Sequence, residues 1–210
     1  MKLFIITPST DVPNEQSLVT KMFETGLTTL HLRKPKYSTN QMTEYLKEIP
    51  AHFHNRIVIH SHHKLALKFR LKGIHLSSTH MSKKWRYIFV RLRLKLRFGK
   101  TSKSRSYSRL QQIYKKEDQN FDYYLIGTMF NNMTGELYSG FYEEGILAAI
   151  KNSDKTLIAR GGTSPKVIAK AAKLGFRGIA FNSYVWNGES PYANFLKIIN
   201  EFKANNISFE

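Results

Sequence analysis

The sequence predicts an α/β protein, a single (β/α)8 TIM barrel, and three observations lead to this prediction. Short apolar runs, typical of strands in a covered parallel sheet, alternate with segments of helical periodicity along the chain. These units number eight if residues 85–105 contribute one helix and one strand. The length of 210 residues suits one domain spanning 1–210 and is near the lower limit for such a barrel.

Apolar residues recur at spacings of three and four between residues 15 and 25, where Leu18 and Val19 precede Met22 and Phe23. This periodicity predicts a helix. It is one of three helices expected in this part of the chain, each followed closely by a glycine or a proline: residues 15–25, 39–49 and 64–72. The apolar runs between them predict four strands: residues 3–7, 28–33, 56–61 and 73–77.

Residues 85–105 do not reveal where one element ends and the next begins. An apolar run, Tyr87 to Val90, is followed by strict alternation of basic and apolar residues up to Arg97. A barrel requires one helix and one strand here, and their boundary stays open. If this stretch held no strand, an open doubly wound sheet would be the more natural architecture.

The alternation becomes clear again after residue 105. Ser164 is expected to cap a helix whose first residue is Pro165. This helix is one of four that we expect: residues 107–116, 141–150, 164–174 and 192–203. The three strands expected between them are residues 122–127, 156–162 and 177–183.

The amino-acid composition indicates the cellular compartment in which the protein is expected. The chain has no cysteine, which excludes disulfides and zinc–thiolate sites. The apolar run at residues 3–6 is too short for the core of a secretory signal, and no stretch approaches the ~18 apolar residues of a membrane span. We therefore expect a cytoplasmic protein that does not bind a membrane.

The formal net charge of +18 is concentrated in one block. Residues 83–116 hold thirteen lysines or arginines and no acidic residue. A nucleic-acid interface is one interpretation of this block. We favour the other, an element with solvent-facing basic positions, because no nucleic-acid-binding motif accompanies it. A basic rim would also attract phosphorylated metabolites.

The loops that follow the strands carry the chemistry of a (β/α)8 barrel. Polar and cationic side chains gather at the predicted strand ends, where carboxylates are nearly absent. Such a site suits an anion, and we expect a small phosphorylated substrate. The candidate substrate-binding residues are His31, Lys34, His60, Ser61, Asn132 and Thr134.

The turn Gly161-Gly162-Thr163-Ser164, between a predicted strand and a helix, is the strongest single motif. Glycine lets the backbone approach an oxyanion closely, and the free N–H groups of a helix start bind phosphate. Asn182 and Ser183 end the neighbouring strand and complete the predicted phosphate site. The alternative is a tight turn that only connects the two elements.

The histidines raise the question of a metal site. His60, His62 and His63 cluster near one strand end, and His80 follows the next strand. Neighbouring strand residues point to opposite faces, so His62 and His63 cannot both point inward. A metal site usually also brings a carboxylate or a tight histidine pair. We therefore expect no metal at these histidines.

Short motifs in the order of the chain resemble those of the thiamine phosphate synthase/TenI family. The start Leu3-Phe4-Ile5-Ile6-Thr7 resembles its YLIT motif, and Leu30-His31-Leu32-Arg33-Lys34 resembles VQLR-K. Further matches are Ile57-Val58-Ile59-His60-Ser61, Gly73-Ile74-His75-Leu76-Ser77, Arg105-Ser106-Tyr107-Ser108, Asp122 to Phe130, Ile158-Ala159-Arg160-Gly161-Gly162 and Gly178-Ile179-Ala180. The family is a compact (β/α)8 barrel, so the resemblance implies a strand in the uncertain middle.

The resemblance implies the coupling of hydroxymethylpyrimidine diphosphate with thiazole phosphate, which gives thiamine phosphate and pyrophosphate. The family's magnesium ion is held by two aspartates, and Ser61 and His80 stand at those positions. Mg2+ is therefore the cofactor expected of the family, but its ligands are missing here. Arg33 and Ser106 match catalytic positions, and His80 is a candidate to replace the lost cation; these three are the predicted catalytic residues.

Three hypotheses of different classes follow. The first is a thiamine phosphate synthase-type transferase with a degraded magnesium site. The second is a TenI-like thiazole phosphate tautomerase or a non-catalytic binder of thiamine phosphates, although Ser108 stands where the resemblance expects the tautomerase histidine. The third is a nucleic-acid-associated protein that uses the basic block. The oligomeric state stays open, with a homodimer as one possibility.

Overall fold

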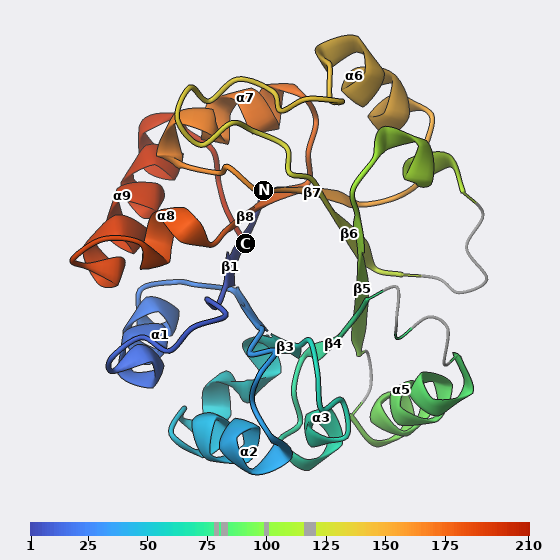
Figure 1. The fold of residues 1–210 in the computed structure, drawn as a ribbon, viewed down its shortest axis with the longest axis vertical. Coiled ribbons are helices and arrows are strands. Elements are labelled where there is room, and N and C mark those ends of the chain that lie inside the picture. The colour runs from blue at the N-terminus through green and yellow to red at the C-terminus, as the bar shows by residue number, and fades with distance from the viewer. Residues whose placement is uncertain (78–79, 81–83, 99–100, 116–120) are drawn as a thin grey trace. The chain divides into compact units, whose positions relative to one another are not determined.

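Eight parallel strands follow one another in chain order in a closed barrel. This is a computed structural model, which describes residues 1–77, 80, 84–98, 101–115 and 121–210. The predicted (β/α)8 barrel is confirmed, and the open doubly wound alternative is wrong. Figure 1 follows the strands from blue to red. They are β1 (Lys2–Ile6), β2 (Thr29–Leu32), β3 (Ile57–Ile59), β4 (Gly73–Leu76), β5 (Ser102–Tyr107), β6 (Tyr123–Ile126), β7 (Leu157–Arg160) and β8 (Gly178–Phe181).

Helices connect the strands as the alternation predicts. The α-helices described are α1 (Glu15–Glu24), α2 (Thr39–Lys47), α3 (Leu65–Lys68), α5 (Lys84–Phe98), α6 (Glu143–Lys151), α7 (Ile168–Lys173), α8 (Ser183–Trp186) and α9 (Pro191–Ala204). Three 3-10 helices, η1 (Ala51–Arg56), η2 (Leu110–Tyr114) and η3 (Pro165–Val167), complete the set. Among the described residues, no helix combines the length and the apolar character needed to cross a membrane.

The chain divides into two compact units. We call residues 6–104 the N-terminal unit, and residues 1–5 together with 105–210 the C-terminal unit. Parallel pairing joins β2, β3 and β4 within the N-terminal unit. Within the C-terminal unit it joins β6, β7, β8 and β1.

The core of each unit is built from the apolar positions that give its helices their periodicity. In the N-terminal unit, Met22 and Phe23 of α1 are buried, and Phe23 stacks on Phe53 with ring centroids 5.1 Å apart. In the C-terminal unit, Phe195 and Phe202 of α9 are fully buried. Burial of these side chains is the main favourable term that holds helix against sheet.

The middle of the chain supplies the expected helix and strand, as α5 and β5. The alternating segment lies in α5, so the apolar residues two apart do not share a face. Val90 and Leu94, four residues apart, are buried, whereas Leu92 and Leu96 are exposed. A helix brings residues four apart to the same side, which explains why only every second apolar residue of the pattern is covered.

Three predicted helix features differ in detail from the structure. The helix expected at 64–72 is the single turn α3, and the one expected at 107–116 is η2. Ser164 takes the N-cap position before Pro165, but its side chain makes no capping hydrogen bond. The first turn is of the tight 3-10 type, and the Ser164 carbonyl accepts a hydrogen bond from Val167 N at 3.2 Å.

Gly73, at the start of β4, allows two strands of the N-terminal unit to meet. A Cβ at this position would overlap the carbonyl oxygen of Ser102 in β5. We expect Gly73→Ala to lower the free energy of unfolding by about 3 kcal/mol, because backbone must move to admit one methyl group. Denaturant unfolding measures this loss.

Gly140→Ala is the matched control for this substitution. Gly140 has a φ of +88° and no atom within 4 Å of the added Cβ, so only backbone strain of about 1–2 kcal/mol is expected. Equal losses for the two variants would contradict the close approach at Gly73.

Candidate functional site

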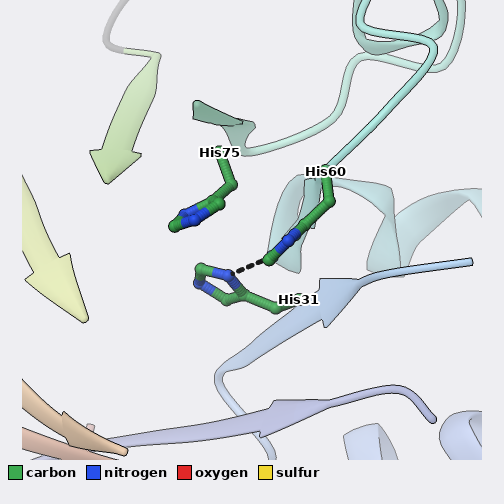
Figure 2. Close-up of side chains that lie close together, drawn as sticks. All are labelled: His31, His60 and His75. Atoms are coloured by element: carbon green, nitrogen blue, oxygen red, sulfur yellow. Dashed lines mark hydrogen bonds between the residues drawn. The ribbon is translucent and has the colours of Figure 1, made fainter. Parts of the chain in front are cut away.

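Three histidines of the N-terminal unit lie together: His31 in β2, His60 directly after β3, and His75 in β4. The register pairs Ile59 with Ile74, so the next residues, His60 and His75, stand side by side on one face. His31 pairs with the residue two positions before His60 and therefore shares that face. Figure 2 shows the three rings pointing toward one another.

Direct contacts hold this histidine cluster, by which we mean His31, His60 and His75. His31 Nδ1 lies 2.9 Å from His60 Nε2, so one of the two rings donates a hydrogen to the other. The rings of His60 and His75 stack with centroids 4.1 Å apart and an interplanar angle of 19°. On the other side, His75 Nδ1 lies 2.9 Å from the hydroxyl oxygen of Ser104.

Burial keeps His31 and His60 uncharged near neutral pH. His31 has no exposed surface, and loss of hydration, with the nearby charge of Lys72 as a smaller cause, lowers its pKa to about 3. Burial also lowers the pKa of His60 well below its ordinary value, and the neighbouring His75 and His31 add to this effect. Neutral imidazoles of this kind accept protons, donate hydrogen bonds or bind metal ions.

A neighbouring pair of histidines, His63 and His80, contacts the histidine cluster through the backbone of His75. His63 Nε2 lies 3.1 Å from the carbonyl oxygen of His75 and fixes the backbone of that residue. Burial, with His80 as a further cause, lowers the pKa of His63 to about 4. His80, a predicted catalytic residue, packs its ring against His63 at 4.7 Å, and its Nδ1 accepts a hydrogen bond from Ser77 N at 3.2 Å.

Arg33 and Lys34 follow β2 but lie in different environments. Arg33 is exposed, and its backbone exchanges two hydrogen bonds with the Thr7 hydroxyl at 2.8 and 3.2 Å. Lys34 is 1% exposed, and its ammonium donates to Glu15 Oε2 at 2.6 Å and to the Thr10 carbonyl at 2.7 Å. The Tyr45 hydroxyl donates to the other Glu15 oxygen at 2.8 Å. The structure therefore places Lys34 in a buried ion pair, while its predicted role toward substrate stays a prediction.

Ser61 and His80, which stand at the positions of the expected magnesium aspartates, offer no carboxylate. The Ser61 hydroxyl is buried and finds no hydrogen-bond partner among the described residues. Mg2+ prefers carboxylate and carbonyl oxygens and water. Within the described part of the chain, the histidine cluster is the set of three or more potential ligands close enough to share one ion. These residues do not fit magnesium.

The paired glycines belong to the C-terminal unit. Gly161 and Gly162 have φ values of +82° and +66°, which favour glycine. A Cβ on Gly161 would lie 2.8 Å from the Cα of Thr128, and one on Gly162 would overlap the Phe130 carbonyl oxygen. The turn therefore packs against the loop that follows β6, and that contact alone requires both glycines.

The other residues predicted to bind phosphate follow β8, the strand next to β7. Parallel pairing joins Arg160 of β7 to Ala180 of β8, and Thr163 Oγ1, just after the paired glycines, donates a hydrogen bond to the Ala180 carbonyl at 2.7 Å. Asn182 is the N-cap of α8, and Ser183 is its first residue. The turn is therefore held against the end of β8, and phosphate binding by these four residues stays a prediction.

The remaining predicted residues of the C-terminal unit occupy separate surroundings. Asn132 lines a cavity of about 530 Å³ together with residues of α9 and with Ser164 and Tyr184. Thr134 Oγ1 accepts a hydrogen bond from Glu136 N at 3.2 Å within the same loop. Ser106 is half-buried in β5.

His31 and His60 were predicted to bind substrate, whereas their contacts with His75 and the contact of His75 with Ser104 were not predicted. The signal that joins them is the strand register. Three histidines on consecutive parallel strands meet only if the pairing aligns them on one face, and the sequence alone does not give that pairing.

Comparisons with known proteins agree with the fold. The family model described as thiamine monophosphate synthase matches residues 3–185. Thiamine-phosphate synthase 1 of Aquifex aeolicus (strain VF5) is 25% identical over 163 residues, covering 75% of this chain and 72% of that protein. A crystal structure of thiamine phosphate pyrophosphorylase from Bacteroides thetaiotaomicron has a TM-score of 0.78 at 26% identity, covering 97% of this chain and 98% of that one. Thiamine phosphate pyrophosphorylase from Pyrococcus furiosus, at 20% identity and a TM-score of 0.75, covers 97% of this chain and 96% of its own and shares the fold.

Acid is expected to destabilise the protein through its buried histidines. The folded-state pKa of His31, about 3, lies below the ordinary value of 6.5, so the unfolded chain takes up protons first as the pH falls. This contribution to stability is complete above pH 6.5 and is lost toward pH 3, at up to about 1.4 kcal/mol per pH unit for each such histidine. Urea unfolding between pH 7.5 and 5 measures the slope.

His31→Gln is expected to reduce that slope, whereas His52→Gln, which removes an exposed histidine, leaves it unchanged. A slope that is the same in the His31→Gln variant and in the unmodified chain would show that burial of this ring does not govern acid stability.

Lys34→Met is expected to cost about 3–5 kcal/mol of stability, because it leaves the Glu15 carboxylate buried without its ion-pair partner. The double variant Glu15→Gln/Lys34→Met should recover most of this loss. The control Lys36→Met removes an exposed lysine two residues away and should change stability by less than about 0.5 kcal/mol. Thermal and denaturant unfolding of the variants test this; a stable Lys34→Met protein would contradict the buried ion pair.

Proposed function

The chain belongs to the thiamine monophosphate synthase family, and from this premise we propose that it joins hydroxymethylpyrimidine diphosphate to thiazole phosphate in thiamine biosynthesis. In this reaction a thiazole nitrogen forms a bond to the methylene carbon of the pyrimidine. The bond from that carbon to the diphosphate oxygen breaks, and pyrophosphate leaves with the electron pair.

The paired-glycine turn is the observation that carries the proposal. Gly161 and Gly162 directly follow β7, and their positive φ values let the backbone approach an oxyanion closely. Thr163 Oγ1 donates to the Ala180 carbonyl at 2.7 Å, which holds this turn against β8, the strand that Asn182 and Ser183 follow. We assign the phosphate of the thiazole to the backbone N–H groups of this turn and of the first residues after β8.

Departure of pyrophosphate develops negative charge that the protein must neutralise. Arg33 is exposed after β2 and carries a guanidinium suited to bidentate binding of phosphate oxygens. His80 and Ser106 are the other proposed catalytic residues, with His31, His60, Ser61, Asn132 and Thr134 as proposed contacts of the substrates. The ammonium of Lys34 is engaged by Glu15, so the exposed Lys36 is the better placed of the two lysines to add positive charge.

The residues present favour a second function in the same family. Ser61 and His80 do not fit magnesium. A chain that keeps the paired-glycine turn and has serine and histidine at these two positions matches a TenI-like thiazole phosphate tautomerase or a non-catalytic binder of thiamine phosphates. A tautomerase needs a general base, and His31 and His60 are the candidates, although burial makes both of them weaker bases than an imidazole in water.

Calorimetric titration with thiazole phosphate and a pyrophosphate-release assay with both substrates separate these functions. The synthase proposal expects binding of thiazole phosphate and release of pyrophosphate. It also expects Arg33→Ala to bind thiazole phosphate normally but release pyrophosphate about 100-fold more slowly. Lys47→Ala, which removes an exposed lysine on α2, should match the unmodified chain in both measurements.

The outcomes of this experiment are distinct. Binding without pyrophosphate release would favour the tautomerase or the non-catalytic binder. Absence of thiazole phosphate binding would overturn both functions, because both depend on binding of phosphate at the paired-glycine turn.

A further inference from the structure

We propose that His31, His60 and His75 bind one divalent transition-metal ion of the zinc class, in a site separate from the magnesium positions of the family. The proposal concerns the N-terminal unit alone. It does not depend on the proposed function, although an ion there would occupy the nitrogens of His31 and His60 that a tautomerase would use as its base.

The distances suit a shared ion. Each of the three rings offers one nitrogen, and these nitrogens lie within 4.8 Å of one another. Imidazole nitrogens bind zinc at about 2.0–2.1 Å, which sets tetrahedral ligands about 3.4 Å apart. His31 Nδ1 and His60 Nε2, now 2.9 Å apart, need to separate slightly, and His75 needs to approach by rotation of its ring. An ion between the first two nitrogens would replace the hydrogen that they share.

Surrounding groups fix the ligands as metal sites require. His31 and His75 lie within strands, and backbone of this kind is rigid. The Ser104 hydroxyl contacts His75 Nδ1 at 2.9 Å and orients that ring. His63 holds the His75 carbonyl from behind at 3.1 Å. Partners of this kind orient ligating histidines and typically contribute 10- to 100-fold in metal affinity.

The donor set selects the class of metal. Three imidazoles without a carboxylate suit Zn2+, Co2+, Ni2+ or Cu2+, whereas Mg2+ requires oxygen ligands. Three protein ligands leave a fourth position of a tetrahedral ion for water or another small ligand. His60 is half-buried while His31 and His75 are buried, so solvent reaches the cluster on the side of His60.

Positive charge nearby sets the expected strength of binding. The charge of Lys72 acts on His31, and that of Arg33 acts on His60. Both oppose a cation at the cluster. We therefore expect a dissociation constant on the order of micromolar, weaker than that of a structural zinc site with thiolate ligands.

The test is titration of the chelator-treated full chain with Zn2+ and with Co2+. Calorimetry should give one ion per chain, and Co2+ should develop the visible absorption of a low-coordinate site that Zn2+ then removes. Mg2+ at the same concentrations should produce no comparable heat. Absence of Zn2+ and Co2+ binding up to millimolar concentration would overturn the proposal.

Matched variants locate the ion. His60→Gln, at the most accessible of the three rings, should weaken binding by 10-fold or more. His52→Gln removes an exposed histidine and should bind as the unmodified chain does. Full binding by a folded His60→Gln variant, or loss of binding in His52→Gln, would overturn the assignment.

A measurement on the unmodified chain keeps the test decisive if His60→Gln does not fold. Nitrogen-15 spectra of the histidine rings should show zinc-dependent shifts at His31, His60 and His75 and little change at His52. Ser104→Ala, which leaves all three ligands in place, should weaken zinc binding by about 10-fold. Shifts confined to other histidines would contradict the site.

Discussion

The parallel register of β2, β3 and β4 is the constraint on which the histidine cluster depends. Side chains alternate between the two faces of a strand, so a slip of one residue would turn a histidine away from its neighbours. The backbone hydrogen bond that His60 N donates to the Leu32 carbonyl, at 3.0 Å, fixes the end of β3 against β2 where the imidazoles meet. Apolar residues adjacent to the histidines, including Leu32, Ile59 and Ile74, are fully buried, so a slipped register would also expose apolar surface.

Burial gives the cluster its chemical character. Imidazoles in water are partly protonated near neutral pH, but His31 has lost its hydration and holds its proton weakly. Nitrogen lone pairs that face one another in such surroundings need a proton or a cation between them. The hydrogen shared by His31 and His60 meets that need, and the Ser104 hydroxyl meets it for one nitrogen of His75. The three rings together hold three nitrogens within 4.8 Å of one another, near the spacing of three ligands around one ion.

The sequence predicted the barrel because each strand and helix carries its own periodicity, and the alternation of the two is local information. The boundary between helix and strand within residues 85–105 could not be predicted, because apolar residues stand at every second position of the segment that forms α5. Only contacts with other elements decide which of them, such as Val90 and Leu94, are covered. The site was harder to predict for the same reason. Lys34 has the charge of a substrate-binding residue, but its partner Glu15 lies 19 residues earlier and becomes visible only once the chain is folded.

The two kinds of chemistry expected of this chain depend on different parts of it. The proposed phosphate site is made by backbone and by the glycines Gly161 and Gly162, which the packing itself requires, so side-chain changes elsewhere leave this turn intact. Binding of a cation depends on individual side chains, so a serine or a histidine in place of an aspartate changes which ions a site can bind. The histidine cluster offers imidazoles in place of oxygen donors, and imidazoles favour ions of the zinc class over magnesium. If the backbone of the barrel holds the phosphate, as we propose, the anion site can persist while the identity and the position of the cation change.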